Sequence, residues 1–235
     1  MTKSNTSDPA NTDRAKLIEE RRQYATGTLN RSDLCATPLQ QFEQWLADAR
    51  SAQLIDATSM ALTTVDADHQ PHTRIVLLKK FDENGFSWFT DQSSAKAQQL
   101  EVNPRACLLF FWRELERQVR IEGRVQMVPA AESDKYFHSR PPGSRFSAAA
   151  SQQSSVVNNR LELETKVKEL QEKYPQGDVP RPDQWGGYCL TPEYFEFWQG
   201  RNDRLHDRFA FTRAADAADK TSIPDAVWST ERLSP

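Results

Sequence analysis

The chain has 235 residues, with 30 lysines and arginines against 33 aspartates and glutamates, so its formal net charge is −3. Hydrophobic residues make up 37% of the chain and charged residues 27%, which is typical of a globular protein with a sizeable core. This charge balance argues against a nucleic-acid binder, and the sequence has neither an apolar run long enough for a membrane span nor a secretory signal. We therefore expect a cytoplasmic protein without nucleic-acid or membrane partners.

The cysteines and histidines argue against a disulfide framework and a metal site. Cys35, Cys107 and Cys189 are odd in number, far apart and never spaced as C-x-x-C. Such a pattern fits neither disulfide pairing nor a cysteine zinc site. His69 and His72 straddle a proline in a predicted turn, which is a poor arrangement for metal ligands. We expect three reduced thiols and no metal.

The N-terminal residues predict a tail and an arm outside the core. Residues 1–13 are rich in Ser, Thr, Asn and Asp and lack periodicity, as in disordered tails. Residues 14–24 form a charged helical stretch with too few apolar side chains for a core helix, so we expect a surface arm or simply a solvated helix. From residue 14 to 235 we expect a single domain.

One amphipathic helix and a series of strands follow. Residues 38–52 place apolar side chains at spacings of three and four, which predicts a helix. Strands are expected at 59–66, at 73–81, where both faces are apolar and therefore buried, and at 86–90, with a hairpin turn over 82–85. Ser93 and Ser94 are suited to cap a short helix that ends before Pro104.

The remaining elements complete a β-rich pattern. Residues 105–112 predict an apolar strand, and 117–127 alternate, with Val119, Ile121, Val125 and Met127 on one face. Two helices are expected, at 130–139 and 158–174, and the segment between them, 140–155, is rich in Pro, Gly and Ser. After a Pro-rich linker at 174–182, short strands are expected at 187–190, 194–198 and 208–212. An acidic surface loop at 214–224 and a last strand near 227–228 follow. These elements predict a mainly β fold with peripheral helices (α+β), as a closed or nearly closed antiparallel barrel.

The first candidate site is the run from Arg204 to Arg208. If the run is extended, its period of two puts Arg204, His206 and Arg208 on one face, where an anion or an electron-rich ring could bind. Nearby aromatic residues such as Trp198 favour a ligand pocket. A surface strand with salt-bridged arginines is the alternative.

Two further groups suggest phosphate recognition. Ser94 and Lys96 lie in the first turn of a predicted helix, where N–H groups and the helix dipole attract anions, although such serines more often only cap the helix. Arg74 lies beside an apolar run and needs an anionic partner. Lys79 is five positions later and faces the opposite way in a regular strand, so the two cations share a pocket only through a bulge, strand twist or a subunit interface.

Residues further along the chain could bind a second phosphate and a ring. Tyr136, Arg140 and Ser144 can supply hydroxyl and guanidinium contacts to phosphate, or can simply pack and cap a helix. The amide of Gln153 and the hydroxyl of Ser154 suit the edge of a heteroaromatic ring, though a polar loop explains them equally well.

Taken together, these segments resemble the pyridoxamine 5′-phosphate oxidase family of FMN enzymes. The resemblance is carried by R-R-Q-Y at 21–24, R-I-V-L-L-K at 74–79, L-E-R-Q-V at 115–119, Y-F-H-S-R-P at 136–141, Q-S-S at 153–155, F-W-Q-G at 197–200, R-L-H-D-R at 204–208 and the terminal R-L-S-P. No single motif is decisive, but their joint order and spacing are specific.

The resemblance implies a split β-barrel and a homodimer with FMN at the subunit interface. The implied reaction is oxidation of pyridoxamine or pyridoxine 5′-phosphate by O2 to pyridoxal 5′-phosphate, with release of H2O2 and, from the amine, NH3. The implied cofactor residues are Arg74, Ile75, Val76, Leu77, Leu78, Lys79, Phe89, Thr90, Ser94, Lys96, Gln118, Gln153, Ser154, Trp198 and Arg208. The implied substrate residues are Arg21, Tyr24, Lys79, Tyr136, Arg140, Ser144, Arg204 and His206. Of these, Arg204 and His206 are the implied catalytic pair, positioned over the pyridine ring.

The chain departs from the family pattern at several positions. Ala95 stands where the family usually has an arginine, and losing that contact to the FMN phosphate would remove roughly 1.5–3 kcal/mol, or about ten- to a hundredfold in affinity, if nothing compensates. Phe89 replaces a common tyrosine, Gln23 a common glutamate, and Asp203 a neutral or basic residue. Alternatives to the oxidase are a non-catalytic binder of FMN or pyridoxal phosphate, and a split-barrel flavin reductase acting on another substrate.

Overall fold

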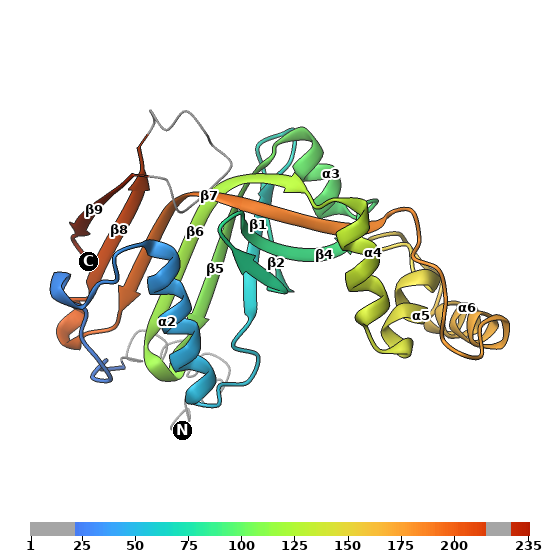
Figure 1. The fold of residues 1–235 in the computed structure, drawn as a ribbon, viewed down its shortest axis with the longest axis horizontal. Coiled ribbons are helices and arrows are strands. Elements are labelled where there is room, and N and C mark those ends of the chain that lie inside the picture. The colour runs from blue at the N-terminus through green and yellow to red at the C-terminus, as the bar shows by residue number, and fades with distance from the viewer. Residues whose placement is uncertain (1–21, 215–226) are drawn as a thin grey trace, which may run out of the picture.

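The computed structural model describes residues 22–214 and 227–235 (Figure 1). Within these ranges a single antiparallel sheet contains all the strands, and its members are β1 (Ser59–Val65), β2 (Pro71–Leu77), β3 (Lys80–Asp82), β4 (Gly85–Asp91), β5 (Arg105–Trp112), β6 (Arg117–Met127), β7 (Trp185–Gln199), β8 (Asp207–Arg213) and β9 (Trp228–Leu233). The helices are α2 (Pro38–Ser51), α3 (Ala95–Val102), α4 (Ala130–Ser139), α5 (Pro142–Ala150) and α6 (Arg160–Lys173). The mainly β prediction with peripheral helices is confirmed.

The sheet curls into a half-barrel around its longest strand. Its order is β2-β1-β5-β6-β7-β4-β3, with β8 and β9 added beside β7. One edge of β7 pairs with β6 along almost its whole length, while the other edge pairs first with β4 and then with β8. Figure 1 shows α2 packed near the β8 end of the sheet and α4, α5 and α6 grouped beyond the opposite end.

A bulge lets β6 follow the curve of β7. The register shifts between Glu122, which lies opposite Tyr194, and Gly123, which lies opposite Pro192. A Cβ on Gly123 would lie 2.0 Å from the Thr191 carbonyl oxygen, so only glycine permits this close approach of the two backbones.

The core is aromatic and centred on α2. Phe42 is fully buried, and its ring centroid lies 4.9 Å from that of Phe86, 5.0 Å from that of Phe110 and 5.2 Å from that of Phe81. Thr37 caps α2, since its hydroxyl accepts from the Gln40 N–H, and Pro38 occupies the first turn. The helix predicted over 38–52 is therefore confirmed.

Several predictions about the strands are wrong. The strand expected over 73–81 ends at Leu77, and its outer face is exposed, with Ile75 67% and Leu77 40% accessible, because β2 is an edge strand that no described element covers. The two short strands expected at 187–190 and 194–198 are one strand, β7. Met127 is 62% exposed because β6 ends there.

The helix predictions need two corrections. The Pro-, Gly- and Ser-rich segment at 140–155, for which the sequence predicts no helix, contains α5, which starts at Pro142 with proline in its favoured first-turn position. Ser94 does stand at the N-cap of α3, but its hydroxyl donates to the Asp91 carbonyl oxygen at 2.6 Å instead of capping. The predicted tail, most of the arm and nearly all of the 214–224 loop lie outside the described residues.

No helix in the part of the chain that the structure describes is long and apolar enough to cross a membrane.

Replacing Phe42 with alanine should destabilise the fold by about 3–5 kcal/mol, because the cavity would open among several rings that cannot collapse into it. Urea unfolding monitored by circular dichroism measures the change. Leu161→Ala on α6, where the side chain is 67% exposed, is the matched control and should change the free energy of unfolding by less than about 0.5 kcal/mol. Equal effects of the two substitutions would contradict this account of the core.

Candidate functional site

A buried lysine lies at the start of α3 among neutral oxygens. Lys96 is 8% exposed, and its amino group donates to Thr90 Oγ1 (3.0 Å), Ser94 Oγ (3.2 Å) and Gln153 Oε1 (2.7 Å). Burial, reinforced by the charge of Arg74, lowers the pKa of Lys96 to about 8, and the charge of Asp91 only partly opposes this. The ammonium group is thus destabilised in its present surroundings and would be stabilised by an anion.

Arg74 approaches the same place from β2 and is held by polar side chains. Its Nη1 donates to Thr64 Oγ1 (2.6 Å) and to the Leu62 carbonyl oxygen (3.2 Å), and its Nη2 donates to Gln99 Oε1 (3.0 Å). Among the residues described, neither Arg74 nor Lys96 forms an ion pair with a carboxylate. Two cations with only neutral partners make this a candidate anion site, which we call the cation cluster.

The loop after α5 closes over the cation cluster. Asp91 accepts from the backbone N–H of Ser93 (2.7 Å) and from that of Gln153 (3.2 Å), so one carboxylate ties this loop to α3. Ser154 has a φ of +72°, and its hydroxyl accepts from the Ala95 N–H at 3.3 Å. The sequence reasoning did not single out Asp91, although an aspartate two residues before a serine at a helix start is a signal for such a turn.

Aromatic rings from β4, β7 and α4 surround a second guanidinium. Phe89, one residue before Thr90, stacks on Tyr136 with ring centroids 4.1 Å apart and on Trp185 at 5.5 Å. The Arg140 guanidinium carbon lies 4.9 Å from the centroid of the Trp185 ring, and burial lowers the pKa of Arg140. Its Nη1 is buried without a hydrogen-bond partner in the described part of the chain.

Other predicted residues surround Trp198 on β7. Gln118 on β6 and Arg208 on β8 both lie directly opposite Trp198, so the three form a row across the strands. The His206 ring lies 4.6 Å from the Trp198 ring, and Tyr24 makes edge contacts with both, at 5.7 Å to Trp198 and 5.4 Å to His206.

His206 has a defined tautomer when neutral. Its Nδ1 accepts from the Arg201 N–H at 3.1 Å, so the ring proton lies on Nε2, which can donate to a ligand. Burial, together with the charge of Arg204, lowers the pKa of His206 and favours this neutral form.

The expectation that 204, 206 and 208 share one face of a strand is wrong. Asp203 and Arg204 are in left-handed conformations, with φ of +55° and +62°, and β8 begins only at Asp207. Arg204 is exposed on this turn, whereas Arg208 is held within the sheet by Glu196.

Some predicted residues belong neither to the cation cluster nor to the residues around Trp198. Lys79 is exposed between β2 and β3, with its N–H bonded to the Ser87 carbonyl oxygen at 2.9 Å. Ile75 and Leu77 face outward on β2, Val76 is half-buried, and Leu78 is buried in the core. Ser144 is half-buried in the first turn of α5. Arg21 lies outside the described residues.

One chain therefore holds two separated groups of predicted site residues. Thr90 lies opposite Gly186 near the start of β7, whereas Gln118 and Arg208 lie opposite Trp198 near its end. Twelve residues of strand between these positions span roughly 40 Å along the strand path. Even allowing for the curve of the sheet, one chain cannot bring both groups to one small ligand.

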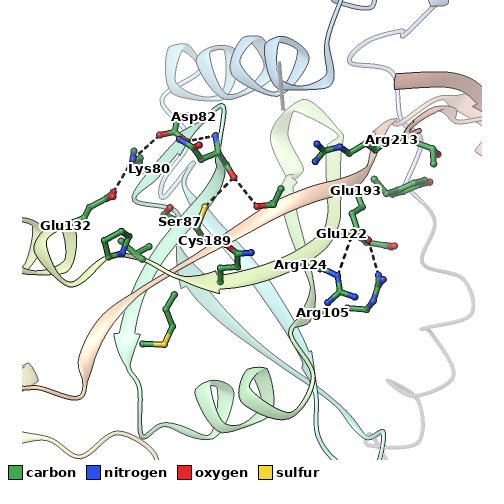
Figure 2. Close-up of a pocket in the computed structure, with 18 of the residues that line it drawn as sticks. Lys80, Asp82, Ser87, Arg105, Glu122, Arg124, Glu132, Cys189, Glu193 and Arg213 are labelled. Carbon is green, nitrogen blue, oxygen red and sulfur yellow. Dashed lines mark hydrogen bonds and ion pairs between the residues drawn. The ribbon is translucent and has the colours of Figure 1, made fainter. Parts of the chain in front are cut away.

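A cavity of about 860 Å³ lies elsewhere, over β3, β4, β6 and β7 (Figure 2). Its charges are already paired: Lys80 contacts Asp82 at 2.9 Å and Glu132 at 3.1 Å, and Glu193 contacts Arg105 at 3.0 Å. No predicted site residue lines this cavity. The contrast favours the cation cluster, whose charges lack such partners, as the anion site.

Comparison with known proteins shows the family of the chain. Residues 46–174 match the family model described as pyridoxamine 5′-phosphate oxidase, and residues 185–235 match the pyridoxine 5′-phosphate oxidase C-terminal dimerisation region. The chain belongs to the pyridoxamine 5′-phosphate oxidase family. The prediction of the family is thereby confirmed, and membership supports FMN as the cofactor.

Individual relatives agree with the family model. A pyridoxine/pyridoxamine 5′-phosphate oxidase of Burkholderia cenocepacia (strain HI2424) is 49% identical over 220 residues, 93% of this chain and 99% of the relative. One from Bordetella petrii (strain ATCC BAA-461 / DSM 12804 / CCUG 43448) is 49% identical over 217 residues, 92% of this chain and 97% of the relative.

Solved structures share the split-barrel fold. PhzG from Burkholderia lata 383, in complex with tetrahydrophenazine-1-carboxylic acid, has a TM-score of 0.81 at 28% identity, covering 89% of this chain and 99% of that one. A pyridoxamine 5′-phosphate oxidase-related, FMN binding protein from Nostoc punctiforme PCC 73102 has a TM-score of 0.64 at 16% identity, covering 86% and 100%. The predicted split barrel is confirmed.

FMN affinity should depend on the proton of Lys96. Because the pKa of this lysine is about 8 without ligand, the affinity should fall as the pH rises above 8 and the attracting charge is lost. Lys96→Gln should weaken binding at pH 7 by about tenfold or more and remove this pH dependence. Quenching of FMN fluorescence on titration with the apoprotein measures both.

Lys166→Gln is the control, since Lys166 is exposed on α6 and pairs with Glu162. It should leave FMN binding unchanged. An affinity for FMN that stays constant from pH 7 to 9.5 in the unaltered protein would contradict the role given to Lys96.

Proposed function

We propose that the protein oxidises pyridoxamine and pyridoxine 5′-phosphates with O2 to pyridoxal 5′-phosphate, releasing H2O2 and, from the amine, NH3. It would thereby act in vitamin B6 metabolism with FMN as its cofactor. The observation that carries the proposal is the buried Nη1 of Arg140, which has no hydrogen-bond partner among the described residues. Arg140 is a second guanidinium, besides Arg74, that an anion would stabilise. It supports a phosphorylated substrate in addition to a phosphorylated cofactor.

The cation cluster fits the phosphate of FMN. Arg74, Lys96 and the N-terminus of α3 together supply charge and N–H donors, and the lowered pKa of Lys96 is the expected consequence of an anion site without its anion. When bound, FMN supplies the hydride acceptor and the reaction with oxygen. The oxygens of Gln153 and Ser154 now bonded to Lys96 and to the Ala95 N–H stand where phosphate oxygens would bind.

Ala95 limits how firmly the phosphate would be held. Its side chain adds no charge to the site, and its N–H is bonded to Ser154. We propose that FMN binding rests on Arg74 and Lys96 without a third cation. The proposal therefore includes an FMN affinity weaker than that of a site with an arginine in place of Ala95.

The substrate phosphate would bind near α4 and α5. Tyr136 and Arg140 belong to the aromatic group around Trp185, and Ser144 lies in the first turn of α5, where the positive end of the helix dipole favours an anion. Lys79 is proposed to join them, and the same guanidinium and hydroxyl donors that bind phosphate would orient the reacting carbon.

Arg204 and His206 are proposed to lie over the pyridine ring of the substrate. Arg204 is exposed and free to reach a ligand, and the neutral His206 can donate its Nε2 proton to an oxygen or nitrogen of that ring. Trp198 and Tyr24 enclose the imidazole, so its orientation is set before the substrate arrives. We assign both residues to positioning and electrostatic assistance, not to obligate proton removal.

A homodimer would complete the site. Since the two groups of residues lie near opposite ends of β7, we propose that the row of Gln118, Trp198 and Arg208 from one subunit faces the cation cluster of the other. The exposed Ile75 and Leu77 on β2 support burial of this edge in an assembly. The match of 185–235 to a dimerisation region supports the same conclusion.

We also propose that residues 14–235 act as one FMN-binding domain in the cytoplasm. Strand β7 hydrogen-bonds to strands from both family-model regions, which supports a single unit. Cys35, Cys107 and Cys189 are all free thiols, which fits a reducing compartment.

A second candidate is oxidation of a tricyclic carboxylic acid, because PhzG was crystallised in complex with tetrahydrophenazine-1-carboxylic acid. The TM-score of 0.81 favours it, but the identity of 28% is well below the 49% to the named vitamin phosphate oxidases. Release of H2O2 with each substrate in turn would separate the two, because the oxidase should turn over pyridoxamine 5′-phosphate and the alternative enzyme the tricyclic acid.

Arg204→Ala should lower turnover of pyridoxamine 5′-phosphate by roughly a hundredfold, since the lost guanidinium is expected to act on the reacting ring. Because Arg204 is exposed on a turn, the melting temperature should hardly change. Release of H2O2 in a coupled assay gives the rate. Arg50 is an exposed arginine at the end of α2, and Arg50→Ala is the control, which should keep full activity. Full activity of Arg204→Ala would contradict the role given to Arg204.

The visible spectrum of the FMN-loaded protein tests the function most directly. Adding pyridoxamine 5′-phosphate without oxygen should bleach the flavin, and admitting air should restore it with pyridoxal 5′-phosphate formed. Pyridoxamine without its phosphate is the control and should bleach the flavin much more slowly. A flavin that binds but is not bleached would reduce the protein to a binder or to an enzyme for another substrate.

A further inference from the structure

A buried carboxylate lies behind the row formed by Gln118, Trp198 and Arg208. Glu196 on β7 is 3% exposed. Its Oε1 accepts from Arg208 Nε at 3.0 Å, and its Oε2 accepts from Arg120 Nη2 at 2.7 Å and from the Tyr194 hydroxyl at 3.2 Å. Neither the motifs of the sequence nor the proposed mechanism uses this residue.

The surroundings keep Glu196 charged. Burial by itself raises the pKa of this carboxyl, but the hydrogen bonds and charges of Arg208 and Arg120 outweigh burial and hold the pKa below its usual value. Burying a carboxylate between two guanidiniums costs desolvation free energy, so such a group suggests a role in fixing the positions of its partners. With Glu196 ionised, this group of three has a net charge of +1 instead of +2.

Within residues 22–214 and 227–235, the contacts of Arg208 leave its Nη2 for a ligand. Its Nε is bonded to Glu196, and its Nη1 donates to the Ser234 carbonyl oxygen at 2.6 Å. The guanidinium is planar, so two fixed nitrogens also fix the direction of Nη2. Glu196 lies two residues from Trp198 on the same face of β7, and Arg208 lies opposite Trp198 on β8.

We propose that Glu196 is a positioning residue that aims Arg208 at the flavin ring and sets the charge felt there. The inference rests on the proposed function in one respect, the contact of Arg208 with FMN. It concerns cofactor binding only, so it does not depend on which substrate is oxidised.

A double-mutant cycle on FMN binding tests the inference. Glu196→Gln keeps the shape of the side chain but removes its charge, and it should raise the dissociation constant of FMN by about tenfold. In an Arg208→Ala background the same substitution should change the constant by less than about twofold, because the residue through which it acts is gone. Fluorescence titration of the apoprotein supplies all four values.

Glu122→Gln is the matched control. Glu122 also contacts Arg120, but its side chain is 43% exposed, and its ion pair is with Arg120 and not with Arg208. This variant should bind FMN as the unaltered protein does. Equal effects of Glu196→Gln with and without Arg208, or no effect at all, would overturn the proposal and leave Glu196 a structural residue.

Two further measurements cover a loss of stability in the first variant. Glu196→Asp keeps the charge but withdraws the carboxylate by one methylene, so it should also weaken FMN binding only while Arg208 is present. The midpoint potential of bound FMN should become more positive in Glu196→Gln, since a nearby negative charge is lost and reduced flavin is more negative. An unchanged potential in a folded, FMN-loaded variant would contradict the charge role.

The outcomes separate this inference from the proposed function. If pyridoxamine 5′-phosphate fails to bleach the flavin but the cycle shows coupling through Arg208, the oxidase proposal fails and the inference stands. If the substrate is oxidised and the cycle shows no coupling, the reverse holds.

Discussion

The fifteen residues of β7, from Trp185 to Gln199, are hydrogen-bonded along both edges, and both groups of site residues are positioned by those bonds. Pairing with β4 at one end places Thr90 beside α3, and pairing with β8 at the other end places Arg208 beside Trp198. The bulge at Gly123 allows β6 to remain paired across the bend between these ends. A strand this long cannot move one group without the other, so the distance between the two groups is a property of the sheet. That distance is what calls for a second subunit.

The partners of the cationic side chains differ between the proposed ligand sites and the rest of the molecule. Lys80 and Arg105, which are exposed along the large cavity, and the half-buried Arg120 beside Glu196 each have a carboxylate partner. Lys96 and Arg74 have only neutral oxygens, and Arg140 has a nitrogen with no partner among the described residues. Since a buried cation without an anion is unfavourable, these three positions are where the fold is incomplete without a ligand. The proposed function assigns the positions of Lys96 and Arg74 to the cofactor phosphate and that of Arg140 to a substrate phosphate.

In the row around Trp198, by contrast, the polar side chains have their hydrogen-bond partners or are uncharged. His206 is kept neutral by burial and by Arg204, with its tautomer set by a backbone N–H, and Arg208 is neutralised in part by Glu196. These contacts fix direction more than they add charge. The proposed function assigns the two ends of β7 different tasks: the cations at one end would bind phosphates, and the oriented donors at the other would contact rings.

The sequence by itself determined the family, the mainly β class and most element positions, because hydrophobic periodicity, caps and turn residues act over a few neighbouring positions. It also singled out Arg74, Lys96, Arg140 and His206, since those residue types at helix starts or beside aromatic residues are suited to anions and rings. Only the tertiary structure decided that β7 is one strand, that β2 ends at Leu77, and that Arg204 leaves the strand in a left-handed turn. The same holds for Asp91 and Glu196, whose partners are 62 and 12 to 76 positions away in the chain. Contacts between residues so far apart depend on strand register and burial, which no local pattern encodes.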